Sequence, residues 1–261
     1  MFPKKSLGQH FLKATAVVGR MVATARISTD DTVLEIGPGK GVLTAALLAN
    51  AGRVVAVEKD DRLIDVLKQT FSHEIALKKL VLVHADALRF VPSDYRLKAK
   101  NYKLVANIPY YITGLLFKKF LGDETQPSCM VLLVQKEVAE RIVAKDGKES
   151  ILSLSIKAYG TPRYIKTVKA REFSPPPKVD SAILAIENIS RTFFDGIDED
   201  DFFTLIKAGF ASKRKFVASN LKKLLPEGSA VCARAGIDPK ARAEDLSLED
   251  WKNILITTNA F

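Results

Sequence analysis

Residues 107–110 read Asn-Ile-Pro-Tyr and directly follow the apolar run KLVA. The exocyclic amine of adenine is a poor nucleophile, because its lone pair is delocalised into the ring. The Asn107 side-chain oxygen and the Ile108 carbonyl, held outward by Pro109, can accept both amine hydrogens and favour a pyramidal nitrogen, while Tyr110 can stack on the purine. The tetrapeptide therefore predicts transfer of a methyl group from a sulfonium to an adenine amine, without a metal or a general base. The alternative is a plain Asx turn closed by proline.

A glycine-rich segment, LEIGPGKGVLT, precedes this tetrapeptide in the chain and suits a ligand site. Gly37, Gly39 and Gly41 follow an apolar run and precede a helix expected to begin near Val42. Glycines permit a tight turn and let a ligand lie against the backbone. The signal alone is weak because dinucleotide enzymes carry similar turns, but a Walker phosphate loop is excluded, since no Gly-Lys-Ser/Thr occurs here.

Two carboxylates follow the next two apolar runs. Glu58 can accept hydrogen bonds from both ribose hydroxyls of an adenosine-containing cofactor, and Asp86, in HADAL, can accept one from the adenine amine. Each has a simpler interpretation, a solvated acid for Glu58 and a turn residue for Asp86. Because all three features follow successive runs, together they favour a nucleoside pocket.

The elements that must position these residues are short β-branched runs alternating with helical patterns. This alternation predicts an α/β fold with a parallel sheet and helices on both faces. A further pair of runs, at 163–170 and 181–187, is expected to add antiparallel strands at the sheet edge, joined by the stiff extended loop FSPPPKVD. The five central runs are TVLEI at 32–36, RVVAV at 53–57, LVLV at 80–83, KLVAN at 103–107 and CMVLLV at 129–134.

Strand patterns stop after Glu187, and four helical stretches follow. The first opens with the acidic residues 198–201, the second is expected from about Ser212 to Leu225, and the last includes Trp251. We therefore predict a catalytic domain at residues 1–190 and a small all-helical C-terminal domain at residues 191–261.

Composition limits the class of protein. The 261 residues carry a formal charge of +10, which points to a polyanionic partner, although residues 191–261 hold equal numbers of basic and acidic residues. No apolar run is long enough to span a bilayer and no signal peptide is seen, so we expect a cytoplasmic protein. Cys129 and Cys232 lack metal-ligand or disulfide spacing, and no metal site is expected.

The sequence resembles the KsgA-type ribosomal RNA adenine dimethyltransferases over nearly its whole length. The family has a class I (Rossmann-like) methyltransferase domain and a small helical C-terminal domain. Its substrate is a pair of adjacent adenosines near the 3′ end of small-subunit rRNA. The matching motifs are GQHFL at 8–12, EIGPGKGVLT at 35–44, VEKD at 57–60, DAL at 86–88, NIPYYIT at 107–113, LVQKEVAER at 133–141 and FSPPPKVDSA at 173–182.

The resemblance implies roles for individual positions. S-adenosyl-L-methionine would lie with its amino-acid end on Gly37 and Gly39, its ribose on Glu58 and its adenine on Asp86. Asn107 would contact both the cofactor and the target amine.

Residues outside the sheet motifs complete the implied site. Tyr110 and Phe173 would stack on opposite faces of the flipped base. If the resemblance is set aside, the simpler interpretation of Phe173 is that it is a core residue. His10 and Leu12 would fold over the cofactor, but many relatives have Asn at position 10, so direct contact by His10 is left open.

A basic cluster in the C-terminal region is the candidate RNA-binding surface. On a helical wheel Val217, Leu221 and Leu224 share one face, and the lysines fall away from it. Such a stripe can bind phosphates or simply be a solvated helix face, and the resemblance favours rRNA. The candidate residues are Lys213, Arg214, Lys215, Lys222 and Lys223.

The resemblance implies as partner the small ribosomal subunit precursor and its rRNA, bound during ribosome biogenesis by a monomer. Three alternatives compete. DNA adenine enzymes usually add a target-recognition region that this compact chain lacks. Erythromycin-resistance enzymes act on large-subunit rRNA and differ in the FSPPPKVDSA and NIPYYIT motifs. A non-catalytic RNA- or DNA-binding factor on the same fold is disfavoured by intact Glu58, Asp86 and Asn107.

Overall fold

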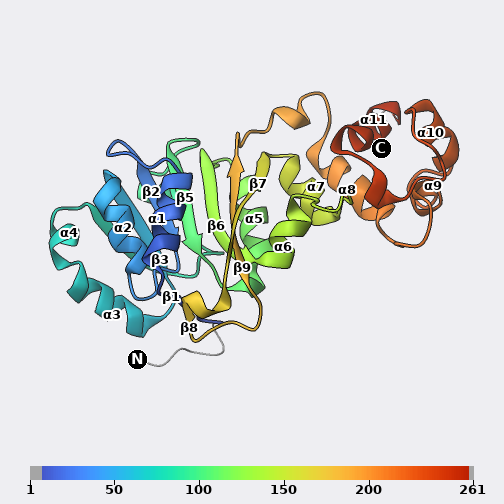
Figure 1. Ribbon diagram of the computed structural model, residues 1–261. Coiled ribbons are helices and arrows are strands. Elements are labelled where there is room, and N and C mark those ends of the chain that lie inside the picture. The colour runs from blue at the N-terminus through green and yellow to red at the C-terminus, as the bar shows by residue number, and fades with distance from the viewer. Residues whose placement is uncertain (1–7, 259–261) are drawn as a thin grey trace. The chain divides into compact units, whose positions relative to one another are not determined.

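The computed structural model describes residues 8–258, which form two compact units (Figure 1). The first comprises the described residues up to 139 together with 161–189, and the second comprises 140–160 together with 190–258. Residues 140–160 therefore join the helical unit, whereas the sequence-based boundary at 190/191 places them in the first domain. Their contacts explain the difference: Ser190 N–H donates to Tyr159 O at 2.8 Å, and the Tyr159 hydroxyl donates to Glu199.

The first unit is built on a seven-stranded sheet of order β4-β3-β2-β5-β6-β9-β7 (Figure 1). The first five strands in that order are parallel, and β9 pairs antiparallel with both β6 and β7, which forms the antiparallel addition that the sequence predicts. Parallel strands buried on both faces are continuous apolar runs, which is how these segments read. The strands are β2 (Thr32–Ile36), β3 (Arg53–Glu58), β4 (Leu80–His84), β5 (Tyr102–Asn107), β6 (Cys129–Gln135), β7 (Thr161–Val168) and β9 (Ser181–Glu187).

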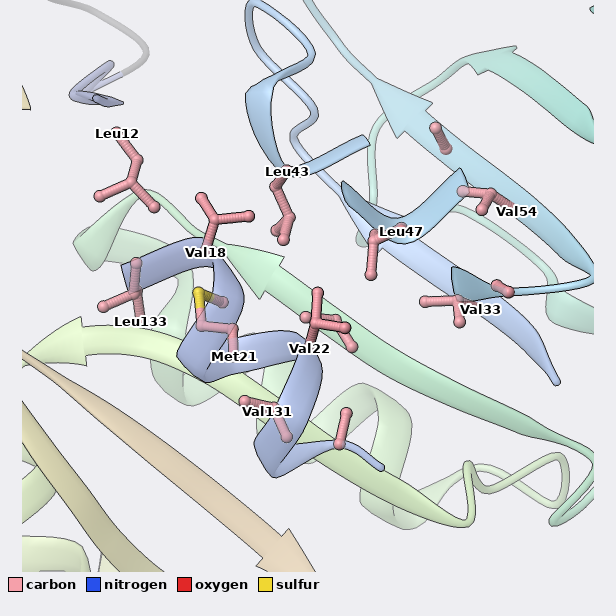
Figure 2. Close-up of a cluster of buried hydrophobic side chains, with 14 of the residues drawn as sticks. Leu12, Val18, Met21, Val22, Val33, Leu43, Leu47, Val54, Val131 and Leu133 are labelled. Atoms are coloured by element: carbon pink, nitrogen blue, oxygen red, sulfur yellow. The ribbon is translucent and has the colours of Figure 1, made fainter. Parts of the chain in front are cut away.

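Helices cover both faces of this sheet. On one face α1 presents Val18, Met21 and Val22, spaced at i, i+3 and i+4, to the same cluster as Leu43 and Leu47 of α2 (Figure 2). The opposite face is covered by α5 (Figures 1 and 2). The helices of this unit are α1 (Thr15–Thr24), α2 (Val42–Asn50), α3 (Asp61–Thr70), α4 (Ser72–Ala76) and α5 (Thr113–Gly122), and α6 (Lys136–Ile142) leads into the second unit.

A separate pair of two-residue strands joins the N-terminal segment to the proline-rich loop. β1 (Phe11–Leu12) runs antiparallel to β8 (Phe173–Ser174), with Leu12 opposite Phe173. The sequence predicts an extended loop at 173–180 but not this pairing. Because the two segments are about 160 residues apart, local patterns contain no sign of it.

The second unit is helical, with α7 (Ile151–Lys157), α8 (Glu199–Gly209), α9 (Val217–Leu221), α10 (Gly228–Arg234) and α11 (Leu248–Thr257). The four stretches expected after residue 191 are present. The second is shorter than predicted, since Phe216 is extended and the preceding residues form a turn. Within the described chain, every helix is too short or too polar to cross a bilayer.

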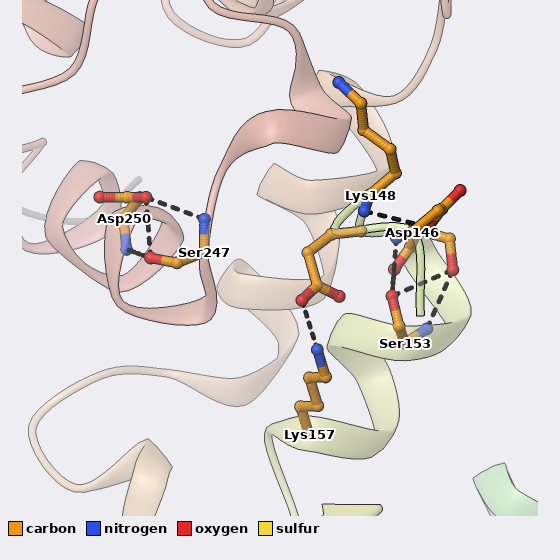
Figure 3. A network of polar contacts seen from close by, with 8 residues as sticks. Asp146, Lys148, Ser153, Lys157, Ser247 and Asp250 are labelled. Carbon is orange, nitrogen blue, oxygen red and sulfur yellow. Dashed lines mark hydrogen bonds and ion pairs between the residues drawn. The ribbon is translucent and has the colours of Figure 1, made fainter. Parts of the chain in front are cut away.

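Polar contacts tie residues 140–160 into this unit. Figure 3 draws the contacts around Lys148, Ser153 and Lys157, together with the cap that Ser247 and Asp250 form on α11. The Lys148 ammonium pairs with Asp245, and Lys157 pairs with Glu149, whose backbone N–H donates to Glu244 O at 2.8 Å. Ser150 caps α7 by accepting from the Ser153 N–H. These contacts connect α7 to the segment that precedes α11.

Candidate active site

One cavity lies at the carboxyl ends of the central strands, where parallel α/β sheets bind ligands. Its wall combines the N-terminal segment with the loops that follow β2, β3, β4 and β5. Ten of the eleven residues predicted for catalysis and cofactor binding line it, all but Phe173. These ten are His10, Leu12, Gly37, Gly39, Glu58, Asp86, Asn107, Ile108, Pro109 and Tyr110.

The glycine loop takes a conformation that side chains resist. Gly37 and Gly41 have φ of +69° and +84°, in the left-handed region. A Cβ on Gly41 would also lie 2.6 Å from the Phe71 ring, whereas one on Gly37 would meet only Asn107 O, at 3.8 Å. Position 37 therefore favours glycine because of its backbone conformation. Position 41 favours glycine both because of its backbone conformation and because a Cβ would meet the Phe71 ring.

Glu58 is held at the end of β3 by the backbone around it. Its Oε1 accepts from the N–H groups of Lys59 and Asp60, both at 2.8 Å, and its Oε2 accepts from Gly39 N–H at 3.1 Å. Only 6% of the residue is exposed, and this burial raises the pKa of Glu58, while the three hydrogen bonds oppose the rise. A carboxylate has about four acceptor positions, so Oε2 retains one that can accept from a ligand.

Asp86 lies in the same cavity but is engaged by a cation. Its Oδ2 pairs with the Lys59 ammonium at 2.8 Å, and its Oδ1 accepts from Leu88 N–H at 2.9 Å. The hydrogen bond from Lys59 holds the pKa of Asp86 below its ordinary value. Each oxygen of Asp86 keeps a further acceptor position for a ligand amine, but the amine must approach beside the Lys59 ammonium, an ion pair that the sequence does not reveal.

The Asn107 amide is oriented by the N-terminal segment. Its Nδ2 donates to the His10 carbonyl at 3.0 Å, which leaves Oδ1 as the acceptor of this side chain. His10 is itself held by Pro175, whose carbonyl lies 2.8 Å from His10 Nδ1. Because a carbonyl only accepts, Nδ1 carries the proton of this hydrogen bond.

The rest of the tetrapeptide forms a turn beside Asn107. Ile108 is buried, and the carbonyls of Pro109 and Tyr110 accept bonds within this turn, from Ile112 N–H at 3.2 Å and from the Thr113 hydroxyl at 2.9 Å. The Tyr110 hydroxyl lies 2.7 Å from Ser181 Oγ, and burial raises the pKa of Tyr110. Its ring is nearly parallel to that of His10, with 6.1 Å between centroids and 22° between planes.

Phe173 lies in the core. The side chain is 1% exposed and belongs to the same apolar cluster as Leu12 and Val18, because β8 pairs with β1 there. Its predicted stacking on a base gets no support from this position, since the ring would first have to leave the cluster. The simpler interpretation of Phe173, a core residue, describes its place in the structure.

Sequence reasoning missed one ionisable group close to the cavity. Glu35, within β2, is 1% exposed and lies beside Thr44 of α2. Burial raises its pKa to about 8. The sequence signal is present, since this acid interrupts the otherwise apolar segment TVLEI.

The five basic candidates lie on the second unit and are all exposed. Residues 213–215 form a turn before α9 rather than part of a helix, and Lys222 and Lys223 follow the end of α9. The predicted apolar face is largely observed, with Val217 and Leu221 fully buried. The predicted single basic helix is wrong, because the turn and the helix are separate elements.

Comparison with known proteins identifies the family. The family model for ribosomal RNA adenine dimethylase matches residues 3–259. The ribosomal RNA small subunit methyltransferase A of Dehalococcoides mccartyi is 44% identical over 97% of this chain and 87% of that protein, and that of Thermosynechococcus vestitus is 39% identical over 95% and 94%.

Solved structures show the same architecture. A dimethyladenosine transferase from Plasmodium falciparum superposes with a TM-score of 0.83 and 27% identity, covering 96% of this chain and 98% of that one. The 23S rRNA methyltransferase ErmE gives 0.77 and 25% identity, covering 95% and 99%. Both the expected family and the expected fold class are confirmed, and the chain belongs to the ribosomal RNA adenine dimethylase family.

Proposed function

We propose that this protein dimethylates the exocyclic amines of two adjacent adenosines near the 3′ end of small-subunit rRNA, in the precursor of the small ribosomal subunit. The observation that carries the proposal is the orientation of Asn107, whose Nδ2 is held by the His10 carbonyl, so that Oδ1 is the acceptor for an amine hydrogen. The names of the curated relatives support the small subunit over the large one.

The cavity suits S-adenosylmethionine, which supplies a methyl group on a sulfonium. Gly37 and Gly39, both at positive φ, allow its amino-acid end to lie against the backbone. The remaining acceptor position on Glu58 Oε2 suits a ribose hydroxyl, and Asp86 suits the adenine amine. Leu12, buried at the cavity wall, would contribute apolar contact.

The chain's own residues then prepare the target amine. Asn107 Oδ1 and the Ile108 carbonyl accept its hydrogens, which draws the lone pair out of conjugation with the ring, and Tyr110 supports the base. Preorganised acceptors need not reorient during the reaction, so they favour the transition state over the free substrate. The cationic amine formed by the first transfer releases one proton to solvent, which leaves a monomethylated amine with one hydrogen and a lone pair, so the same residues serve a second transfer.

The exposed basic residues of the second unit supply the docking surface for rRNA. Lysine and arginine side chains that contact phosphates release condensed counterions, so binding should weaken steeply with salt. Monomeric state and cytoplasmic location stay predictions from the sequence.

A transfer assay tests the proposal. The protein is incubated with labelled S-adenosylmethionine and, separately, immature small subunits, large-subunit rRNA and duplex DNA, and the products are digested and analysed by mass spectrometry. We expect dimethyladenosine in small-subunit rRNA alone. Transfer confined to large-subunit RNA, or product that stops at monomethyladenosine with cofactor in excess, would overturn it.

A further inference from the structure

The turn before α9 combines an exposed aromatic ring with a cluster of cations. Phe216 is 44% exposed, although the next two residues, Val217 and Ala218, are buried. It directly follows Lys213, Arg214 and Lys215, all exposed. A phenylalanine ring in water loses the free energy that burial would provide, so an exposed ring among cations suits a ligand with both an apolar face and negative charge.

The charge around this turn has one sign over a long stretch of chain. Residues 202–226 contain no Asp or Glu and hold six basic residues, the five RNA-binding candidates and Lys207. The hydrogen bond from Val217 N–H to Ala241 O, at 2.8 Å, brings the segment with Lys240 and Arg242 beside Phe216. Two carboxylates flank that segment: Asp238 Oδ1 accepts from Lys240 N–H at 2.8 Å, and Asp245 Oδ2 accepts from Arg242 N–H at 3.2 Å.

The turn is held in place from within the fold. Asn220 is buried, and its Nδ2 donates to Gly209 O at 2.6 Å and to Ser212 O at 3.0 Å. Lys215 N–H also donates to Ser212 O, at 3.1 Å. These bonds fix both ends of the 209–215 segment relative to α9, so little ordering remains for the backbone when a ligand binds.

We infer that Phe216 is a stacking platform for an unpaired RNA base, with the phosphates on either side of that base bound by the basic residues of the turn. Bases in a duplex are already stacked on their neighbours, so an aromatic side chain selects loops, bulges and ends. This inference rests on the proposed rRNA substrate and adds to it the kind of RNA element that the second unit recognises. None of the residues of this turn lines the cavity described above.

Binding of the full chain to two RNA probes tests the inference. One probe is a hairpin whose single-stranded loop carries a fluorescent purine analogue, and the other is a duplex with the same stem sequence. Phe216→Ala should weaken hairpin binding by about 5- to 10-fold, near the lower end of what one base–aromatic stack contributes, since only part of the ring is exposed. Duplex affinity should stay the same, and the analogue's quenching on binding should disappear.

Three further variants separate stacking from other effects. Phe216→Leu keeps apolar bulk without an aromatic face and should behave like Phe216→Ala. Ile256→Ala removes another large exposed side chain of the same unit, 53% exposed, and should bind both probes like wild type. Replacing Lys213, Arg214 and Lys215 together with Ala should weaken binding to both probes and flatten the salt dependence, whereas Phe216→Ala should leave the salt slope unchanged.

The outcomes distinguish this inference from the proposed function. Hairpin binding by Phe216→Ala at wild-type affinity, or an equal loss on hairpin and duplex, overturns the stacking role while methylation of small subunits continues. Failure of the wild-type chain to methylate small-subunit rRNA overturns the proposed function and, with it, the inferred role of the turn. Unfolding midpoints of the variants, expected to match wild type because Phe216 is exposed, exclude misfolding as the cause.

Discussion

Glu35 should make the stability of this protein depend on pH in the direction opposite to an ordinary acid. Its folded-state pKa is about 8 against a reference of 4.5, so between these values the folded chain holds a proton that the unfolded chain has released. The contribution of Glu35 to the free energy of unfolding is fully present below the unfolded-state pKa of 4.5. It is lost as the pH rises toward the folded-state pKa of about 8. The slope is about 1.4 kcal/mol per pH unit, or about 3 kcal/mol from pH 5 to pH 7.5.

Glu35→Gln removes this dependence while keeping the shape of the side chain beside Thr44. Urea unfolding of both proteins at several pH values gives the free energy of unfolding at each, and the difference between them cancels the other titrating groups. Over that pH range, we expect the free energy of unfolding of Glu35→Gln to rise by about 3 kcal/mol relative to that of wild type. Glu35→Leu should show the same flattened profile whatever its absolute stability. Parallel profiles for wild type and Glu35→Gln would refute the reasoning, because Glu35 would then ionise alike in both states.

Three further predictions address the cavity and its glycine loop. Glu58→Ala should weaken binding of S-adenosylmethionine by about 1.5–3 kcal/mol, the range for a hydrogen bond to a charged group, and calorimetry that finds unchanged affinity in the folded variant would remove Glu58 from the site. Asn107→Ala should lower the methyl-transfer rate on the order of 10²–10³-fold with little change in RNA affinity, because one preorganised acceptor is lost; full activity in single-turnover assays would contradict its assignment. Gly41→Ala should destabilise the fold by about 2–4 kcal/mol, since alanine would adopt a left-handed conformation and approach the Phe71 ring. Gly114→Ala, whose Cβ meets nothing within 4 Å in α5, is the matched control, and similar unfolding midpoints for the two variants would count against the packing argument.

The strands of the sheet could be predicted from sequence because each one is a short apolar run of consecutive residues. The runs at 32–36 and 181–187 coincide with β2 and β9, since a strand covered on both faces is apolar at most of its positions. The helix before residue 225 was predicted too long. Its start depends on Phe216 being extended and on Asn220 bonding back to Gly209 and Ser212, contacts that a helical wheel does not include.

The cavity was predictable to the extent that its residues end successive parallel strands. Fold topology alone brings Gly37, Glu58, Asp86 and Asn107 to one edge of the sheet. The engagement of Asp86 by Lys59 was not predictable, because it depends on a side-chain conformation across two loops. The same holds for the core position of Phe173 and for the protonation of Glu35, which follow from tertiary burial.

The N-terminal segment does more in the site than cover a cofactor, because it also holds other residues of the cavity in place. Its His10 carbonyl holds the Asn107 amide, its His10 ring is held by the Pro175 carbonyl, and its Leu12 pairs with Phe173. The backbone that forms one wall of the cavity therefore also determines which atom of Asn107 is left to accept a hydrogen bond there. If this segment moved away, the amide could rotate and present its donor, and the acceptor geometry would be lost with residues 107–110 unchanged. The chemistry predicted from a tetrapeptide thus depends on contacts with residues about 70 and 100 positions away in sequence.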